Sequence, residues 1–167
     1  MRTSLVRIAV CILAMACGLE APARGLCASR SGEPARVVFV CEHGSVKSLV
    51  AMMYFNRRAG ERGLPYRAVA RGMTPEPVVP AAVRDGLRAD GFAISAFTPQ
   101  KFDMSDADHA LLVVSFDQEL ARTIDGRARY VKWDDLPGVV SDYARGRAEI
   151  RRRVNELIDE LTRATTP

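Results

Sequence analysis

Two short, nearly unbroken apolar runs, at 35–40 and 110–116, constrain the fold more than any other feature of the chain. Both are rich in β-branched and aromatic residues, which is typical of strands buried on both faces of a parallel sheet. Two further strand candidates lie at 66–70 and 130–133. Segments with helical periodicity separate these strands. The sequence therefore predicts an α/β fold, an open, doubly wound, four-stranded parallel sheet with helices on both faces.

Three helices are predicted, at 45–60, 80–90 and 141–164. Gly60 and Gly91 stand where the first two should end, a common position for glycine. The last helix carries an apolar stripe among charged residues, as expected for a helix with one face on a core. The stripe consists of Ile150, Val154, Leu157, Ile158 and Leu161.

The first part of the chain, residues 1–28, is typical of an export signal. Two arginines precede a stretch of 12 apolar residues at 8–19, and small residues follow at candidate cleavage points near Ala23 and Ala28. As a helix this stretch spans about 18 Å, against about 30 Å for a bilayer core, so no permanent transmembrane helix is predicted. We expect an exported, periplasmic protein. A lipid anchor at Cys17 is the alternative, because its surroundings loosely resemble a lipid-attachment site.

Behind the signal, a polar lead-in at 29–34 precedes a single domain at 35–164, in which no repeat or linker occurs. The net charge of +4 is only mildly basic, and no cluster of basic residues with interleaved aromatics occurs, so nucleic-acid binding is not predicted. Two histidines and a lone thiol do not have the spacing of metal ligands, so no metal is predicted either. Cleavage after Ala28 leaves Cys41 as the one cysteine of the mature chain.

Cys41 directly follows the first predicted strand and precedes a helix, at the sheet edge where such folds bind ligands. The positive end of a helix dipole favours the nucleophilic thiolate. The next residues can turn their amide groups inward to form an oxyanion cradle, and Gly44 permits the positive φ that such a turn needs. Lys47 adds a fixed charge, and Ser48 a hydroxyl for the thiolate. The predicted cradle consists of Glu42, His43, Gly44, Ser45, Val46, Lys47 and Ser48.

This arrangement suits attack on a tetrahedral oxyanion such as phosphate or arsenate. The alternative is that Cys41 is a buried, inert side chain, as free cysteines often are. The polar residues that follow it argue against that alternative.

The stretch 41–48 resembles the C-x5-R-S/T loop of the low-molecular-weight protein tyrosine phosphatase superfamily, above all its arsenate-reductase-like branch. The likeness continues through 70–72 to 97–101 and covers most of 35–160. It implies the same fold, a nucleophilic cysteine, a phosphocysteine intermediate and no metal or organic cofactor. Two residues depart from the family pattern: Lys47 replaces its arginine, and Gly44 its asparagine. An ammonium group offers a point charge where a guanidinium grips two oxygens at once.

The same resemblance implies a general acid on a later loop, where the family usually has Asp-Pro. Here the matching stretch is 133–138, in which Asp134 and Asp135 are both candidates. A turn with an aspartate as helix cap is the alternative for this stretch.

Together these features predict a cysteine-dependent phosphatase that acts on phosphomonoesters or phosphotyrosine, with a phosphorylated protein as one candidate partner. A non-catalytic module that binds phosphate or arsenate is the first alternative. The second is a single-cysteine arsenate reductase that uses an external thiol, because no cysteine follows Cys41 to form an internal disulfide.

Overall fold

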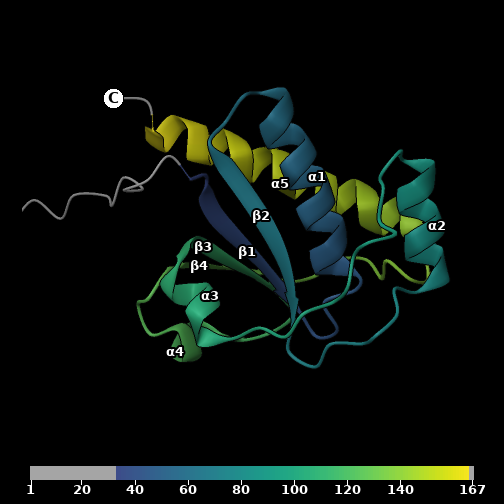
Figure 1. Cartoon of the computed structure of the whole chain (residues 1–167), viewed down its shortest axis with the longest axis horizontal. Coiled ribbons are helices and arrows are strands. Elements are labelled where there is room, and N and C mark those ends of the chain that lie inside the picture. Colours follow the sequence, from purple (N-terminus) through teal and green to yellow (C-terminus); the bar gives the residue numbers. More distant parts are fainter. Residues whose placement is uncertain (1–32, 166–167) are drawn as a thin grey trace, which may run out of the picture.

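The computed structural model describes residues 33–165, so the predicted export signal at 1–28 and the alternative lipid anchor at Cys17 lie outside the described residues. Within the described part, four parallel strands form one sheet in the order β2-β1-β3-β4 (Figure 1). The strands are β1 (Ala35–Cys41), β2 (Tyr66–Gly72), β3 (Ala110–Phe116) and β4 (Arg129–Trp133). The predicted α/β fold with a four-stranded parallel sheet is confirmed.

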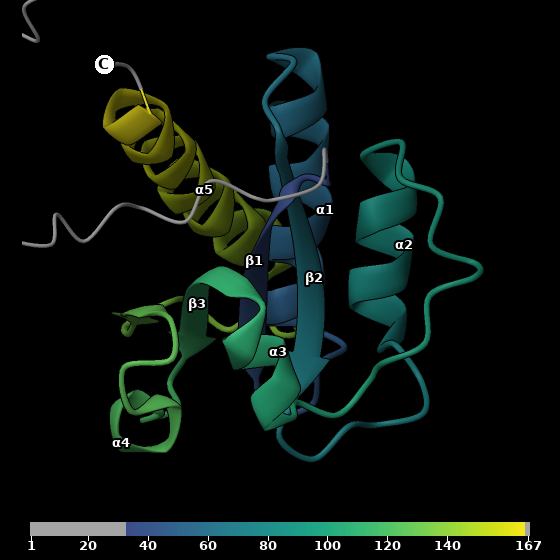
Figure 2. The same cartoon turned by 60° about the vertical axis from the view of Figure 1, so that its left-hand side comes forward.

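Helices cover both faces of this sheet (Figures 1 and 2). One face carries α1 (Lys47–Glu61), α2 (Ala81–Ala89) and α5 (Tyr143–Thr165), and the other carries α3 (Met104–Asp108) and α4 (Ala121–Ile124). The two short helices were not predicted, because five and four residues are too few to show a helical period. No helix of the described residues is long and apolar enough to cross a membrane.

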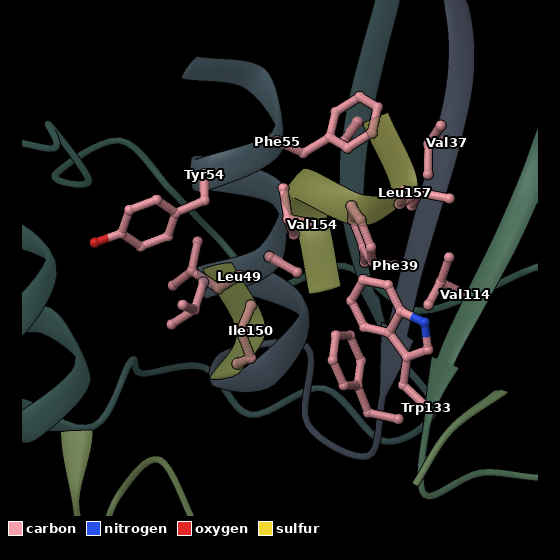
Figure 3. Packing of buried hydrophobic residues seen from close by; sticks show 14 of the residues in the cluster. Val37, Phe39, Leu49, Tyr54, Phe55, Val114, Trp133, Ile150, Val154 and Leu157 are labelled. Atoms are coloured by element: carbon pink, nitrogen blue, oxygen red, sulfur yellow. The ribbon is translucent and has the colours of Figure 1, made fainter. Parts of the chain in front are cut away.

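The central strand β1 is buried on both faces, as its apolar run predicts. Val37 and Phe39 belong to the larger core, under α1 and α5, while Val38 and Val40 belong to the smaller core on the other face. The ring of Phe39 packs against those of Phe55, Phe116 and Trp133, with distances of 5.8 to 6.1 Å between ring centroids. Figure 3 shows Phe39 among the labelled Phe55 and Trp133. Because so much apolar surface fixes β1, its last residue, Cys41, has a fixed place at the carboxyl edge of the sheet.

The helices on the larger core present the side chains that the periodicity predicts. All five residues of the α5 stripe are at most 5% exposed, and Val83 and Leu87 of α2 are fully buried. Fully burying one such side chain contributes about 1.5–3 kcal/mol, so this stripe is what attaches α5 to the sheet.

A carboxylate network joins three helices beside this core. Asp90, which ends α2, accepts hydrogen bonds from the hydroxyls of Tyr54 in α1 (2.8 Å) and Tyr143 in α5 (2.7 Å), and it forms an ion pair with Arg147. Burial alone raises the pKa of Asp90, but the hydrogen bonds from Tyr143, Tyr54 and Arg147 outweigh it and hold the pKa below its usual 3.8. The network therefore stabilises the fold only while Asp90 is ionised.

Replacing Asp90 by Asn should cost about 2 kcal/mol of unfolding free energy near neutral pH, the scale of hydrogen bonds to one charged group. Since the folded-state pKa lies below the unfolded value, the difference from wild type should be complete above about pH 4 and shrink as the pH falls through the folded-state pKa. Urea unfolding at about pH 7 and about pH 3 measures this. Asp85→Asn, an exposed carboxylate of α2, is the matched control. An undiminished difference at about pH 3 would contradict the account.

Candidate active site

The sulfur of Cys41 lies at the junction of β1 and α1. Cys41 is the last residue of β1, only 5% exposed, and α1 begins six residues later at Lys47. The hydroxyl oxygen of Ser48 is 3.1 Å from Sγ, and the Gly44 N–H donates to Sγ at 3.3 Å. The sulfur is thus surrounded by a hydroxyl group, a backbone N–H donor and the positive end of the α1 dipole.

The loop between β1 and α1 turns its carbonyl groups away from the sulfur. The carbonyls of Cys41, Glu42 and His43 accept hydrogen bonds from the amides of residues 73, 74 and 76, at 3.0, 2.8 and 3.3 Å. In a trans peptide the C=O and the following N–H point in opposite directions. The N–H groups of residues 42–44 therefore face away from that segment, and the Gly44 N–H does point at the sulfur. Successive amides aimed this way form a cradle for an oxyanion.

Two glycines hold the cradle in this shape. Gly44 has a φ of +69°, and a Cβ on it would lie 2.8 Å from the backbone nitrogen of Gly72 at the end of β2. A Cβ on Gly72 would in turn lie 2.7 Å from the nitrogen of Gly44. The loop and the strand end thus touch backbone to backbone. This contact is made by Gly44, the residue that replaces the asparagine of the family pattern.

Lys47 reaches the rim of the cradle and forms an ion pair with Asp117, the first residue after β3. Its side chain is 18% exposed and that of Asp117 is 49% exposed. An ion pair this accessible to water contributes at most about 1 kcal/mol, so an arriving anion can compete for Lys47. Asp117 was not among the predicted site residues. Its place directly after the predicted strand at 110–116 makes it a candidate by sequence, but that this strand pairs with β1 is known only from the structure.

A cavity of about 440 Å³ opens above Cys41. Its lining combines polar side chains with four apolar ones: Val46, Phe116, Val139 and Val140. Gln118 donates a hydrogen bond of 2.9 Å to the Glu42 carboxylate, and both side chains line the same cavity. An apolar wall around a few polar groups is typical of a small-molecule site.

The other cradle residues differ in exposure. The His43 ring is half exposed and lies 3.4 Å from the Glu76 carboxylate. Ser45 is fully buried, and its hydroxyl has no hydrogen-bond partner within the described residues. Val46 precedes α1 and lines the cavity. Across residues 33–165, no three His, Cys, Asp or Glu side chains lie together in a way that could hold a metal ion.

Asp134 and Asp135, the predicted general acids, follow β4 but do not line the cavity. Asp134 lies 3.3 Å from the ammonium of Lys132, and this hydrogen bond raises the pKa of Lys132. Asp135 has a φ of +59°. The loop they begin continues into 138–141, which forms one wall of the cavity. Their catalytic role stays a prediction.

A family profile described as "Low molecular weight phosphotyrosine protein phosphatase" matches residues 36–165. The chain belongs to this family. The sequence-based assignment to the superfamily is thereby confirmed. No curated protein matched the chain.

Solved structures of similar proteins share the fold. A low-molecular-weight protein tyrosine phosphatase from T. tengcongensis is 18% identical with a TM-score of 0.66, covering 75% of this chain and 99% of its own. The YwlE arginine phosphatase from Geobacillus stearothermophilus is 16% identical with a TM-score of 0.64, and the match covers 78% of this chain and 95% of that one. A thioredoxin-dependent arsenate reductase from Corynebacterium glutamicum is 17% identical with a TM-score of 0.64, and the match covers 80% of this chain and 64% of that one. The family and its neighbours thus include both phosphatases and arsenate reductases.

Gly72→Ala should weaken phosphate binding at least about tenfold, the scale of one lost hydrogen bond to a charged group. The new Cβ would push on Gly44 and displace the amides behind it. Isothermal titration with inorganic phosphate measures the affinity. Gly60→Ala, where a Cβ meets nothing within 4 Å, is the control and should bind as wild type does. Equal affinities for both variants would show that the glycine contact does not shape the cradle.

Proposed function

We propose that the protein is a cysteine-dependent phosphatase that hydrolyses phosphomonoesters, phosphotyrosine among them, through a phosphocysteine at Cys41. One observation carries the proposal: the sulfur lies between Ser48 Oγ and the Gly44 N–H at the amino end of α1. Membership of the phosphatase family supports it. Export through residues 1–28 is part of the proposal and is supported by the sequence alone.

The reaction runs in two displacements. The Cys41 thiolate attacks phosphorus, the amides of the loop and Lys47 hold the non-bridging oxygens, and the alcohol leaves on the far side. Donors placed where negative charge develops are typically the largest contribution of an enzyme to such a step. Water then attacks the phosphocysteine, and Ser48 and the Gly44 N–H stabilise the departing thiolate.

The apolar wall of the cavity is compatible with phosphate esters of many alcohols, both aromatic and aliphatic. Val139 and Val140 line the same cavity as Cys41, and an aromatic or aliphatic leaving group would pack on them there. No aromatic side chain of the 138–141 segment is present to stack on a tyrosine ring. Phosphotyrosine is therefore one substrate among several in this proposal, rather than a defining one.

Binding without turnover is the second candidate, because Lys47 replaces the family arginine and Asp117 engages it. A lysine cannot grip two phosphate oxygens in the planar, bidentate way. The third, arsenate reduction, would need an external thiol, since no cysteine follows Cys41. Consumption of a thiol reductant with arsenate distinguishes it from phosphate ester hydrolysis.

Cys41→Ser should abolish hydrolysis of p-nitrophenyl phosphate, because a serine hydroxyl is a far weaker nucleophile than a thiolate at neutral pH. Ser48→Ala should retain the nucleophile and lose about tenfold in rate, the scale of one hydrogen bond to a charged group. Release of p-nitrophenol measures both. Turnover by Cys41→Ser at the wild-type rate would show that Cys41 is not the nucleophile. No turnover in wild type or in any variant would contradict the phosphatase proposal and favour a module that binds an oxyanion without catalysis.

Lys47→Arg should raise the rate of the same hydrolysis by about tenfold or more, because a guanidinium restores two parallel hydrogen bonds to the transferring phosphoryl group. The measurement is kcat/KM for wild type and variant at one ionic strength. Lys132→Arg, which makes the same exchange outside the cavity, is the control. A variant no faster than wild type would mean that Lys47 is not a weakened substitute for the family arginine.

A further inference from the structure

A second charged residue shares the rim of the cavity with Lys47. Asp117 lines the same cavity as Cys41, at the end of the neighbouring strand β3, and its carboxylate is half exposed. In an in-line displacement the leaving oxygen lies on the opposite side of phosphorus from the attacking sulfur. Cys41 is 5% exposed and the Asp117 side chain is 49% exposed, so along the cavity that both line Asp117 is the residue nearer to solvent. The leaving oxygen, which points away from the buried sulfur, would therefore lie on the side of Asp117.

The partner of Asp117 depends on what occupies the cradle. In the absence of an oxyanion its carboxylate pairs with the Lys47 ammonium. A phosphoryl group in the cradle would draw that ammonium toward its own oxygens, because phosphate oxygens compete with a carboxylate for the same cation. The Asp117 carboxyl group would then be released from its ion pair and lie beside the phosphoryl group.

The surrounding groups do not cancel this effect. Glu42, at the end of β1, is a second negative charge in the same cavity. On the β4 side, Lys132 is engaged by Asp134 at 3.3 Å and by Glu119 at 3.8 Å. The half-exposed His43 lies beside the Glu76 carboxylate. Of these neighbours, Lys47 is the cation that directly contacts Asp117, and the substrate competes for it.

We propose that Asp117 is the catalytic acid of the phosphatase reaction. The assignment rests on the proposed function. As the Cys41–phosphorus bond forms and the bond from phosphorus to the leaving oxygen breaks, Asp117 gives its proton to that oxygen, and the alcohol departs neutral. The Asp117 carboxylate then takes a proton from the water that attacks the phosphocysteine, and the sulfur leaves as thiolate.

This assignment differs from the acid that the family resemblance implies. Asp134 and Asp135 follow β4, which is separated from β1 by β3, and neither lines the cavity. Asp117 follows β3 itself, which pairs directly with β1. The backbone of Asp117 has a φ of +60°, a conformation that Asp and Asn adopt more readily than most residues.

The test is a series of aryl phosphates whose leaving groups range from p-nitrophenol to phenol, with kcat/KM measured for the full-length protein. Asp117→Asn keeps the shape of the side chain and its tolerance of positive φ. A basic leaving group needs the proton most, so this variant should lose about 10²–10⁴-fold on phenyl phosphate. It should lose much less on p-nitrophenyl phosphate. Asp134→Asn and Asp135→Asn are measured beside it, and Asp85→Asn, an exposed position of α2, is the control.

The pH profile gives a second readout that a purely structural role would not change. An acid must be protonated to act, so wild-type kcat/KM should fall as the pH rises through its titration in the complex, and Asp117→Asn should lose this limb. An equal loss on every leaving group would overturn the assignment. So would a steep leaving-group dependence in Asp134→Asn or Asp135→Asn but not in Asp117→Asn.

Failure of the assignment can be distinguished from failure of the proposed function. Wild-type turnover that depends on Cys41, together with an Asp117→Asn series parallel to wild type, overturns the assignment alone. Absence of turnover on every ester overturns both.

Discussion

The contact between the backbones of Gly44 and Gly72 is the constraint on which the rest of the site depends. A β-carbon on either residue would approach the other backbone to 2.8 Å or less, so only two glycines allow the loop after β1 to rest against the end of β2. That contact brings the loop carbonyls to the amides of residues 73, 74 and 76, and it leaves the Gly44 N–H directed at the sulfur. The surroundings of the Cys41 sulfur therefore follow from backbone packing, and the side chains of the loop are free to differ from those of the family.

Much of the fold was predictable from the sequence because its strongest signals come from burial. The run at 110–116 gives the bounds of β3 without error, and the stripe on α5 names five residues that are all buried. The short helix α3 gave no such signal. It is held by local bonds between Asp103 and Ser105 and by a capping box with Asp106, which need no apolar period. The residues next to Cys41 in the loop could be listed from the sequence for a different reason, since they directly follow it along the chain.

The partner of Lys47 was not predictable in the same way. Lys47 and Asp117 are 70 residues apart and meet only because β3 pairs with β1. The strand order β2-β1-β3-β4 places the end of β3 beside the cradle and the end of β4 one strand further away. A reading of the sequence finds acidic residues after both strands and cannot rank them without that order. The sheet order thus brings Asp117 beside Lys47 and the cradle, a placement that the sequence alone does not give.

Lys47 and the arginine that it replaces differ in how firmly each would bind the Asp117 carboxylate. A guanidinium forms two parallel bonds to one partner, so it binds a carboxylate or a phosphate strongly and leaves either reluctantly. An ammonium is a single centre with rotatable donors, and its exposed pair with Asp117 is weak enough to be replaced by a phosphoryl group. The apolar wall formed by Phe116, Val139 and Val140 strengthens that replacement, because charges interact more strongly where side chains exclude water. In the proposed reaction Lys47 therefore holds the transition state less firmly than an arginine would, but it also allows an arriving phosphoryl group to displace Asp117 from the ion pair.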